Sequence, residues 1–140
     1  MTIDEVKNYL NQVRDIDKLI DLKLKRLAEL NAQKTAIGSQ DFSKERVNSS
    51  PSGDTLSSLI DKIVDFQREI NADIDHFVDL KAEIMRNIDL LKDPDDKVFL
   101  YAKYFEYKKH SVIAEEMCCS ERNAVKIHKR ALLRLAEILK

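Results

Sequence analysis

The chain has 140 residues, a length that suits one domain or one small domain with an extension. It contains only two Gly, two Pro and no Trp, and 35% of its residues are charged. Few helix breakers and no runs rich in Val, Thr and aromatic residues favour long helices over strands. The composition therefore predicts an all-α protein, and no apolar run is long enough to span a membrane.

The charges are unevenly distributed, although the net charge is only −1. Residues 54–96 contain 12 acidic and 5 basic residues, whereas residues 97–140 contain 5 acidic and 10 basic ones. A basic segment behind an acidic one is typical of a localised contact with a polyanion. Two solvated helix faces of opposite charge would give the same pattern, so charge alone leaves both interpretations open.

The first third of the chain predicts one long helix followed by a loop. Apolar residues recur every three or four positions from Ile3 to about Leu30. Thr2 and Glu5 have the spacing of a capping box at the start of this helix. Residues 35–55 are rich in Gly, Ser, Asn and Asp, which are turn-forming residues, and they predict a loop of about that length.

A regular heptad pattern extends from about Thr55 to Leu91 and predicts a coiled coil. One row contains Ile60, Gln67, Ile74, Lys81 and Ile88, and the other contains Ile63, Ile70, Phe77, Ile84 and Leu91. The partner is either the first helix, folded back as a hairpin, or a second copy of the chain. We favour self-association, because an isolated two-helix hairpin buries little core. Residues 1–92 are therefore predicted to be an oligomerisation region.

Residues 93–140 predict a small three-helix domain. Asp93 and Pro94 have the residue types of an N-cap and a first helical position. The three helices are expected at about residues 95–107, 111–117 and 121–139. Asp93, Asp95 and Asp96 lack the spacing of a calcium loop, so we interpret them as capping residues.

The last two helices have the pattern of a helix-turn-helix. Ala114 is small where two helices must cross closely, and Ile113 and Met117 are expected in the core. Cys118 occupies the turn position where Gly is common, and Ser120 is expected to cap the next helix. That helix has a buried stripe formed by Ala124, Ile127, Ala131, Leu135 and Ile138.

The opposite face of the last helix carries Glu121, Arg122, Asn123, Lys126, Lys129, Arg130 and Arg134. The predicted DNA-binding residues are the capping residue Ser120 and, from this face, Glu121, Arg122, Asn123, Lys126, Lys129 and Arg130. The first turns of a recognition helix meet base edges, so Glu121, Arg122, Asn123 and Lys126 are predicted to contact bases. Lys129 and Arg130 lie further along the helix and are predicted to contact phosphates.

Two stretches of this segment resemble region 4 of the sigma-70 family: residues 113–120 (IAEEMCCS) and 125–132 (VKIHKRAL). The heptad helix, the YAKYF sequence at 101–105 and the IHKRAL sequence at 127–132 are similar to phage regulators of the RinA/ArpU type. The chain departs from the pattern at Cys118, where Gly is usual, and at Ala124, where Val or Ile is commoner. The resemblance implies a transcription regulator of phage or prophage late genes, acting in the cytoplasm of a bacterial host cell.

Two other functions remain open from the sequence. A DNA-packaging component of the small-terminase type combines the same parts, and a sigma-like adaptor would bind RNA polymerase instead of DNA. No catalytic motif is recognisable, so we expect no enzyme, no cofactor and no metal. The expected partners are double-stranded DNA and a second copy of the chain, with RNA polymerase as a further candidate and no membrane.

The isolated His and Cys residues suggest no site of their own. His76, His110 and His128 are far apart in sequence and have no zinc spacing with a Cys. We predict that His110 lies in a loop and His128 on a helix surface. Cys118 and Cys119 are adjacent and have no other Cys to pair with, which indicates a reduced protein.

Overall fold

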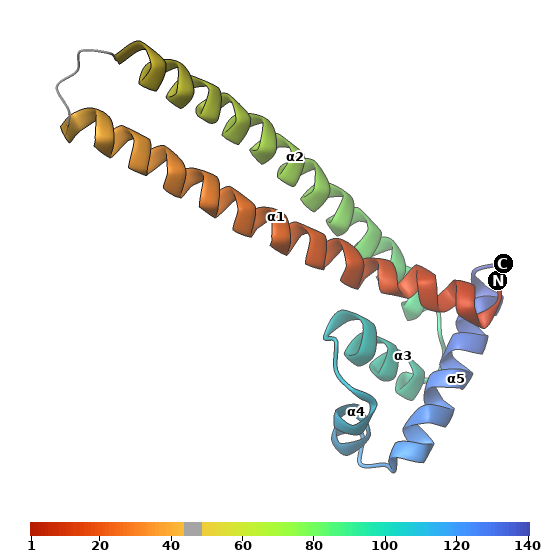
Figure 1. The fold of residues 1–140 in the computed structure, drawn as a ribbon. Helices are drawn as coiled ribbons and strands as arrows, with labels where there is room; N and C mark the ends of the chain where they lie inside the picture. The colour runs from red at the N-terminus through yellow and green to blue at the C-terminus, as the bar shows by residue number, and fades with distance from the viewer. Residues whose placement is uncertain (44–48) are drawn as a thin grey trace. The chain divides into compact units, whose positions relative to one another are not determined.

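The computed structural model describes the backbone of residues 1–43 and 49–140, and the side chains of residues 1–37 and 55–140 (Figure 1). Its elements are α1 (Ile3–Ser43), α2 (Ser49–Asp89), α3 (Pro94–Leu100), a π-helical segment η1 (Tyr101–Phe105), α4 (His110–Glu116) and α5 (Glu121–Ile138). Within these residues there is no strand, which confirms the predicted all-α class. None of the described helices is both long and apolar enough to cross a membrane.

The long helices extend into the segment predicted as a loop. Helix α1 continues to Ser43 and α2 begins at Ser49, so the prediction of a loop over residues 35–55 is wrong for its two flanks. Residues 44–48 of that loop lie outside the described residues. Ile37 packs against the cluster that contains Leu30 and Leu59, and this packing favours helix beyond residue 35. Tertiary contacts thus override local turn propensity there.

The chain divides into two compact units. Unit 1 contains Met1–Asp17 and Phe77–Lys140, and unit 2 contains Lys18–His76. The division differs from the predicted boundary between residues 92 and 93. The reason is that the start of α1 and the end of α2 bury their apolar faces in the same core as α5.

Unit 2 consists of two antiparallel helical segments. Leu30 of α1 packs with Leu59 and Ile63 of α2. Lys23 donates to Glu69 Oε1 over 3.0 Å and also hydrogen-bonds Asp73. Since Lys23 meets Asp73 whereas Leu30, later in α1, meets Leu59, earlier in α2, the two helices pair antiparallel within one chain in this unit.

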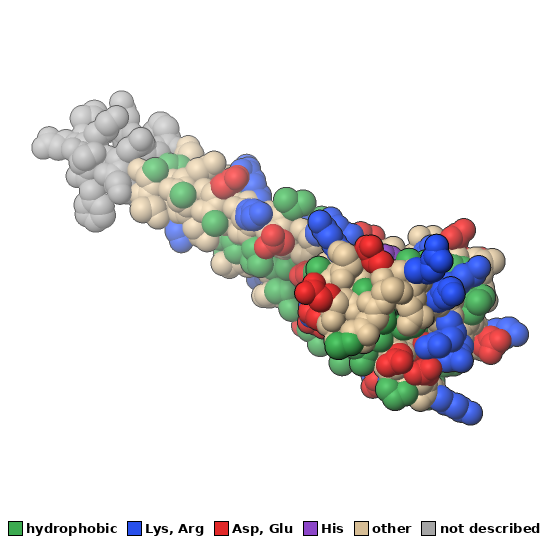
Figure 2. Space-filling view, turned by 90° about the horizontal axis from the view of Figure 1, so that it is seen from below, with side chains coloured by type: hydrophobic (Ala, Val, Ile, Leu, Met, Phe, Trp, Pro, Cys, Tyr) green, Lys and Arg blue, Asp and Glu red, His purple; other side chains and the backbone are tan. Residues whose placement is uncertain are grey.

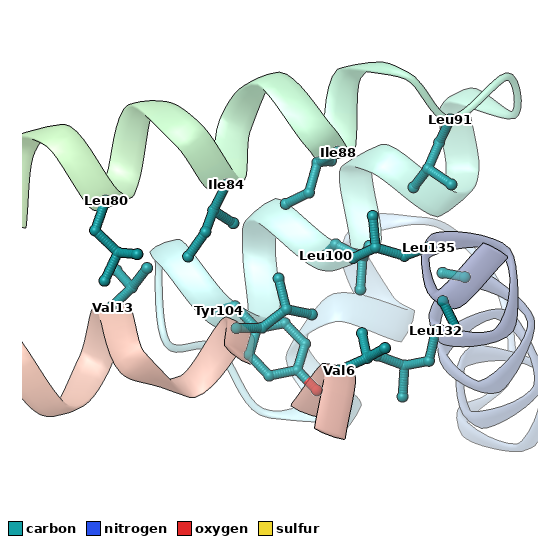
Figure 3. Packing of buried hydrophobic residues seen from close by; sticks show 13 residues of the cluster. Val6, Val13, Leu80, Ile84, Ile88, Leu91, Leu100, Tyr104, Leu132 and Leu135 are labelled. Carbon is teal, nitrogen blue, oxygen red and sulfur yellow. The ribbon is translucent and has the colours of Figure 1, made fainter. Parts of the chain in front are cut away.

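The larger core of unit 1 joins five elements (Figure 3). It contains Val6, Leu10 and Val13 from α1, Leu80, Ile84 and Ile88 from α2, Leu91 after α2, Leu100 and Tyr104 from α3 and η1, and Ala131, Leu132, Leu135 and Ala136 from α5. The predicted capping box starts α1: the Thr2 N–H donates to Glu5 Oε2 over 3.1 Å, and the Glu5 N–H donates to Thr2 Oγ1 over 3.2 Å. Local capping and long-range packing therefore act together at the start of the chain.

The connection between α2 and α4 contains two helical segments of different type. Asp93 caps α3 by accepting from the Asp95 N–H, with Pro94 at the first helical position, as predicted. The single helix predicted over residues 95–107 is wrong in its second half, where the backbone widens into η1 and the Glu106 N–H donates to the Tyr101 carbonyl. The Tyr101 hydroxyl then donates to Asp89 of α2 over 2.7 Å, while Tyr104 is buried.

Candidate nucleic-acid interface

A second, smaller core holds α4 and α5 together. Its buried residues are Phe99, Ala102, Ile113, Ala114, Ala124 and Ile127, with Met117 and Cys119 packed at its edge. Ala114 and Ala124, from the two helices, are 3% and 0% exposed. Small side chains let two helix backbones approach closely, so the sequence prediction for Ala114 agrees with its burial.

The turn between α4 and α5 depends on two residues with different roles. Cys118 has a φ of 56°, in the left-handed region that favours Gly, as the sequence predicts. The Cys119 N–H donates to the Ala114 carbonyl over 2.9 Å and closes the turn. Ser120 Oγ then accepts from the Asn123 N–H over 3.1 Å and caps α5. Ser120 is thus a capping residue in the free protein.

We expect Cys118→Gly to raise the free energy of unfolding by about 0.5–1 kcal/mol. Gly adopts the left-handed conformation without the steric cost that Cys incurs, and this gain exceeds the loss that comes from the greater entropy of the unfolded chain. The matched variant Cys119→Gly should lower the stability, since Cys119 lacks a positive φ and packs against the core. Urea unfolding of both variants measures the difference. A loss of stability in Cys118→Gly would contradict the assignment.

The predicted reading face of α5 is exposed at its first turns. Glu121, Arg122, Asn123, Lys126 and Lys129 are all exposed. Arg122, Lys126 and Lys129 follow one another at helical spacing and therefore share one side of α5. Figure 2 shows Lys and Arg side chains gathered on part of unit 1, with acidic and apolar side chains among them. The exposed face of α5 that carries Glu121, Arg122, Asn123, Lys126 and Lys129 is the candidate nucleic-acid interface.

Arg130, which was predicted to contact phosphate, lies in an ion-pair network. Its Nε and Nη2 donate to Asp96 Oδ1 over 2.9 and 2.7 Å, and Nη2 lies 3.1 Å from Asp93 Oδ2. Arg134 Nη1 donates to Asp96 Oδ2 over 2.6 Å. Asp96 is fully buried, while both arginines remain partly exposed. The network joins the start of α3 to the second half of α5, and it goes beyond the capping role predicted for Asp96.

Three further cations gather on unit 1 from distant parts of the sequence. Burial lowers the pKa of Lys103, and repulsion from Arg14 and Lys7 lowers it further. Because Arg14 and Lys7 act on Lys103 through their charge, the three side chains lie near one another in unit 1. The sequence pattern did not predict them as a group, because residues 7 and 14 lie about ninety positions before residue 103.

His128 and His110 lie side by side in the fold. The predicted position of His128 on a helix surface is wrong, because its side chain is buried. His128 is only 9% exposed, and its ring stacks on Phe99 with 5.1 Å between centroids. Its Nε2 lies 2.8 Å from Tyr104 Oη, and its Nδ1 lies 3.4 Å from Nε2 of His110. His110 is the first residue of α4 and not a loop residue.

Burial is also the main cause of the low basicity of His128. It lowers the pKa of His128 to about 3, with smaller contributions from His110, Lys103 and Lys7. Burial and Lys103 also lower the pKa of His110. His128 follows Ala124 by four positions and precedes Leu135 by seven, which is the spacing that would have indicated an inward side chain.

Comparison with known proteins identifies no relative. No protein-family model matches the chain, and neither the curated proteins nor the solved structures contain a significant match.

Proposed function

We propose that the chain is a sequence-specific DNA-binding regulator of transcription that reads the major groove with α5. The observation that carries the proposal is the division of α5 into two faces. Ala124, Ile127 and Leu135 are buried on one face, while Arg122 and Lys126 are exposed on the other. A helix packed on one side and cationic on the other suits groove docking.

The exposed residues divide into two groups by their position along α5. Arg122 can form two hydrogen bonds with guanine, Asn123 two with adenine, and Glu121 can accept from cytosine. Lys126 lies one turn later and is assigned to bases or adjacent phosphates, and Lys129 to phosphates. Arg130 is a weaker candidate for a phosphate contact, because Asp96 and Asp93 already balance its charge.

Lys7, Arg14 and Lys103 are additional candidates for phosphate contacts. Among the described side chains, none of the three forms an ion pair with an acidic residue, and Lys103 Nζ lies 5.8 Å from the centroid of the Tyr104 ring. Their charge is therefore available to a polyanion. Regulation of phage or prophage late genes is the biological setting that the resemblance to RinA/ArpU-type regulators suggests for such a protein.

A sigma-like adaptor is the second candidate function. Leu133 is 47% exposed, although it lies beside Lys126, Lys129, Arg130 and Arg134 in a shallow groove of about 370 Å³. An apolar side chain among cations suits an acidic protein segment as well as DNA. Charge-reversal variants of this groove that keep DNA binding but lose binding to RNA polymerase would support the adaptor.

Selection from random duplex DNA tests the leading proposal. We expect a recovered consensus, with relaxed specificity in Arg122→Ala and Asn123→Ala. Lys129→Ala should weaken binding to all duplexes and reduce the salt slope by about 1. The matched control Lys25→Ala removes the same charge from unit 2, where Lys25 is exposed beside Asp21, and should leave the slope unchanged. Absence of duplex binding at low salt would overturn the proposal.

A further inference from the structure

Helix α2 carries an uncharged stripe within unit 2 that remains exposed among the described residues of that unit. The stripe consists of Ile60, Val64, Gln67, Asn71 and Ile74, which we call the outer stripe. Its residues are separated by four, three, four and three positions, which is the spacing of a coiled-coil seam. All five are exposed, and the three apolar ones are 41%, 39% and 36% exposed in chain order.

A second stripe on the same helix is packed against α1. Leu59, Ile63, Phe66 and Ile70 have the same spacing, one position earlier, and we call them the inner stripe. Leu59 and Ile63 are buried against Leu30 of α1, with Phe66 packed beside them. Helix α2 therefore has two neighbouring coiled-coil seams, and α1 fills only the inner one.

The core of unit 2 is small for the length of helix that it supports. Among its described side chains, five apolar ones are buried, Ile20, Leu30, Leu59, Ile63 and Ile70, and Leu27, Ile37 and Phe66 are partly buried. A two-helix segment with so few buried residues is marginally stable alone. Covering the outer stripe would bury Ile60, Val64 and Ile74 and extend the same core to a second layer of helices.

We propose that a second copy of the chain covers the outer stripe, and that the two α2 helices pair parallel and in register over residues 60–74. The proposal identifies the surface for self-association and does not depend on DNA binding. In this pairing each residue of the stripe faces its own counterpart. Isoleucine and valine then meet apolar partners, and the amides of Gln67 and Asn71 meet amides.

The polar residues of the stripe favour this orientation. In a parallel pair Asn71 occupies the heptad position at which a single Asn specifies register and a two-stranded state. An antiparallel pair could also match the amides by setting Gln67 opposite Asn71, but Ile60 would then lie opposite a position beyond the end of the stripe. The parallel pair matches all five residues of the stripe and gives both amides a polar partner, so it is preferred.

Single-cysteine cross-linking of the full chain tests both the surface and the orientation. In a Cys118→Ser, Cys119→Ser background, we expect Ile60→Cys and Ile74→Cys each to form disulfide-linked dimers under mild oxidation. The control Ala72→Cys places an exposed thiol elsewhere on the same helix and should not cross-link. Failure of the two variants to cross-link with themselves, whether or not their mixture cross-links, would overturn the parallel arrangement.

Sedimentation of cysteine-free full-length protein tests association without any cross-link. We expect a dimer at micromolar concentration, and at least about tenfold weaker association in Ile74→Lys. Ala72→Lys adds the same charge outside the stripe and should associate normally. Because Ile74 is exposed, Ile74→Lys should keep its helical circular dichroism. A monomeric cysteine-free protein, or a ring-sized mass far above a dimer, would overturn the proposal.

Discussion

Asp96→Ala is expected to lower the free energy of unfolding by about 2–3 kcal/mol, because it removes three charge-assisted hydrogen bonds from Arg130 and Arg134. Replacing both arginines with Ala should lower the stability further. The reason is an asymmetry of burial: the arginines are 40% and 48% exposed and can turn to water, whereas the 0% exposed Asp96 would remain buried without a partner.

Urea unfolding of the single, double and triple variants measures this asymmetry as a mutant cycle. The triple variant should recover part of the stability that the double arginine variant loses, since it removes the unpaired buried carboxylate of Asp96 as well as both arginines. Lys129→Ala removes an exposed cation from the same helix and should change stability little. Equal losses in Asp96→Ala and the double arginine variant would contradict the expected asymmetry.

The second large effect is a loss of stability in mild acid caused by His128. Its pKa is about 3 in the folded protein, whereas an unperturbed His has a pKa of about 6.5. Between these values the unfolded chain binds a proton that the folded protein does not. The contribution of His128 to stability is therefore fully present above pH 6.5 and is lost as the pH falls towards 3.

The expected slope approaches about 1.4 kcal/mol per pH unit between pH 6 and 4.5. Tyr104 hydrogen-bonds the His128 ring. His110 of α4, Lys103 of η1 and Lys7 of α1 all oppose the protonation of His128. Protonation would also place a charge against the ring of Phe99 in the core that holds α4 on α5.

Denaturant unfolding from pH 7 to 4.5 measures this effect, with His128→Gln as the matched variant. Gln can still hydrogen-bond the Tyr104 hydroxyl but has no proton to gain in this range. Its stability should therefore fall less steeply with pH than that of the wild type. The acidic residues titrate in both proteins, so the difference between the two curves isolates His128. Parallel curves would show that His128 is not buried in its neutral form.

The sequence predicted the parts of the structure that depend on local chemistry. The capping box of Thr2 and Glu5, the caps at Asp93 and Ser120, and the turn position of Cys118 are all observed. Each rests on residues at most five positions apart, where residue type alone decides which backbone groups are satisfied. The buried stripe of α5 was predicted for the same reason, since helical spacing is a local property.

The heptad rows show where local pattern is not sufficient. Both rows were predicted to be inward, yet Ile63 and Ile70 are buried while Ile60 and Ile74 are 41% and 36% exposed. A heptad indicates that a seam exists but does not identify its partner. The structure assigns one seam to α1 of the same chain, and the proposed dimer assigns the other.

By itself, the sequence determined an all-α chain, its capped helix starts, the turn before α5 and the exposed cationic face of α5. Tertiary structure alone decided the contacts of His128 with Tyr104 and His110, the network of Asp96 with Arg130 and Arg134, and the placement of the two ends of the long helices in one core with α5. The physical reason is sequence separation. Backbone hydrogen bonding and helical periodicity act over a few residues, whereas desolvation and ion pairing depend on groups that approach only when the chain has folded.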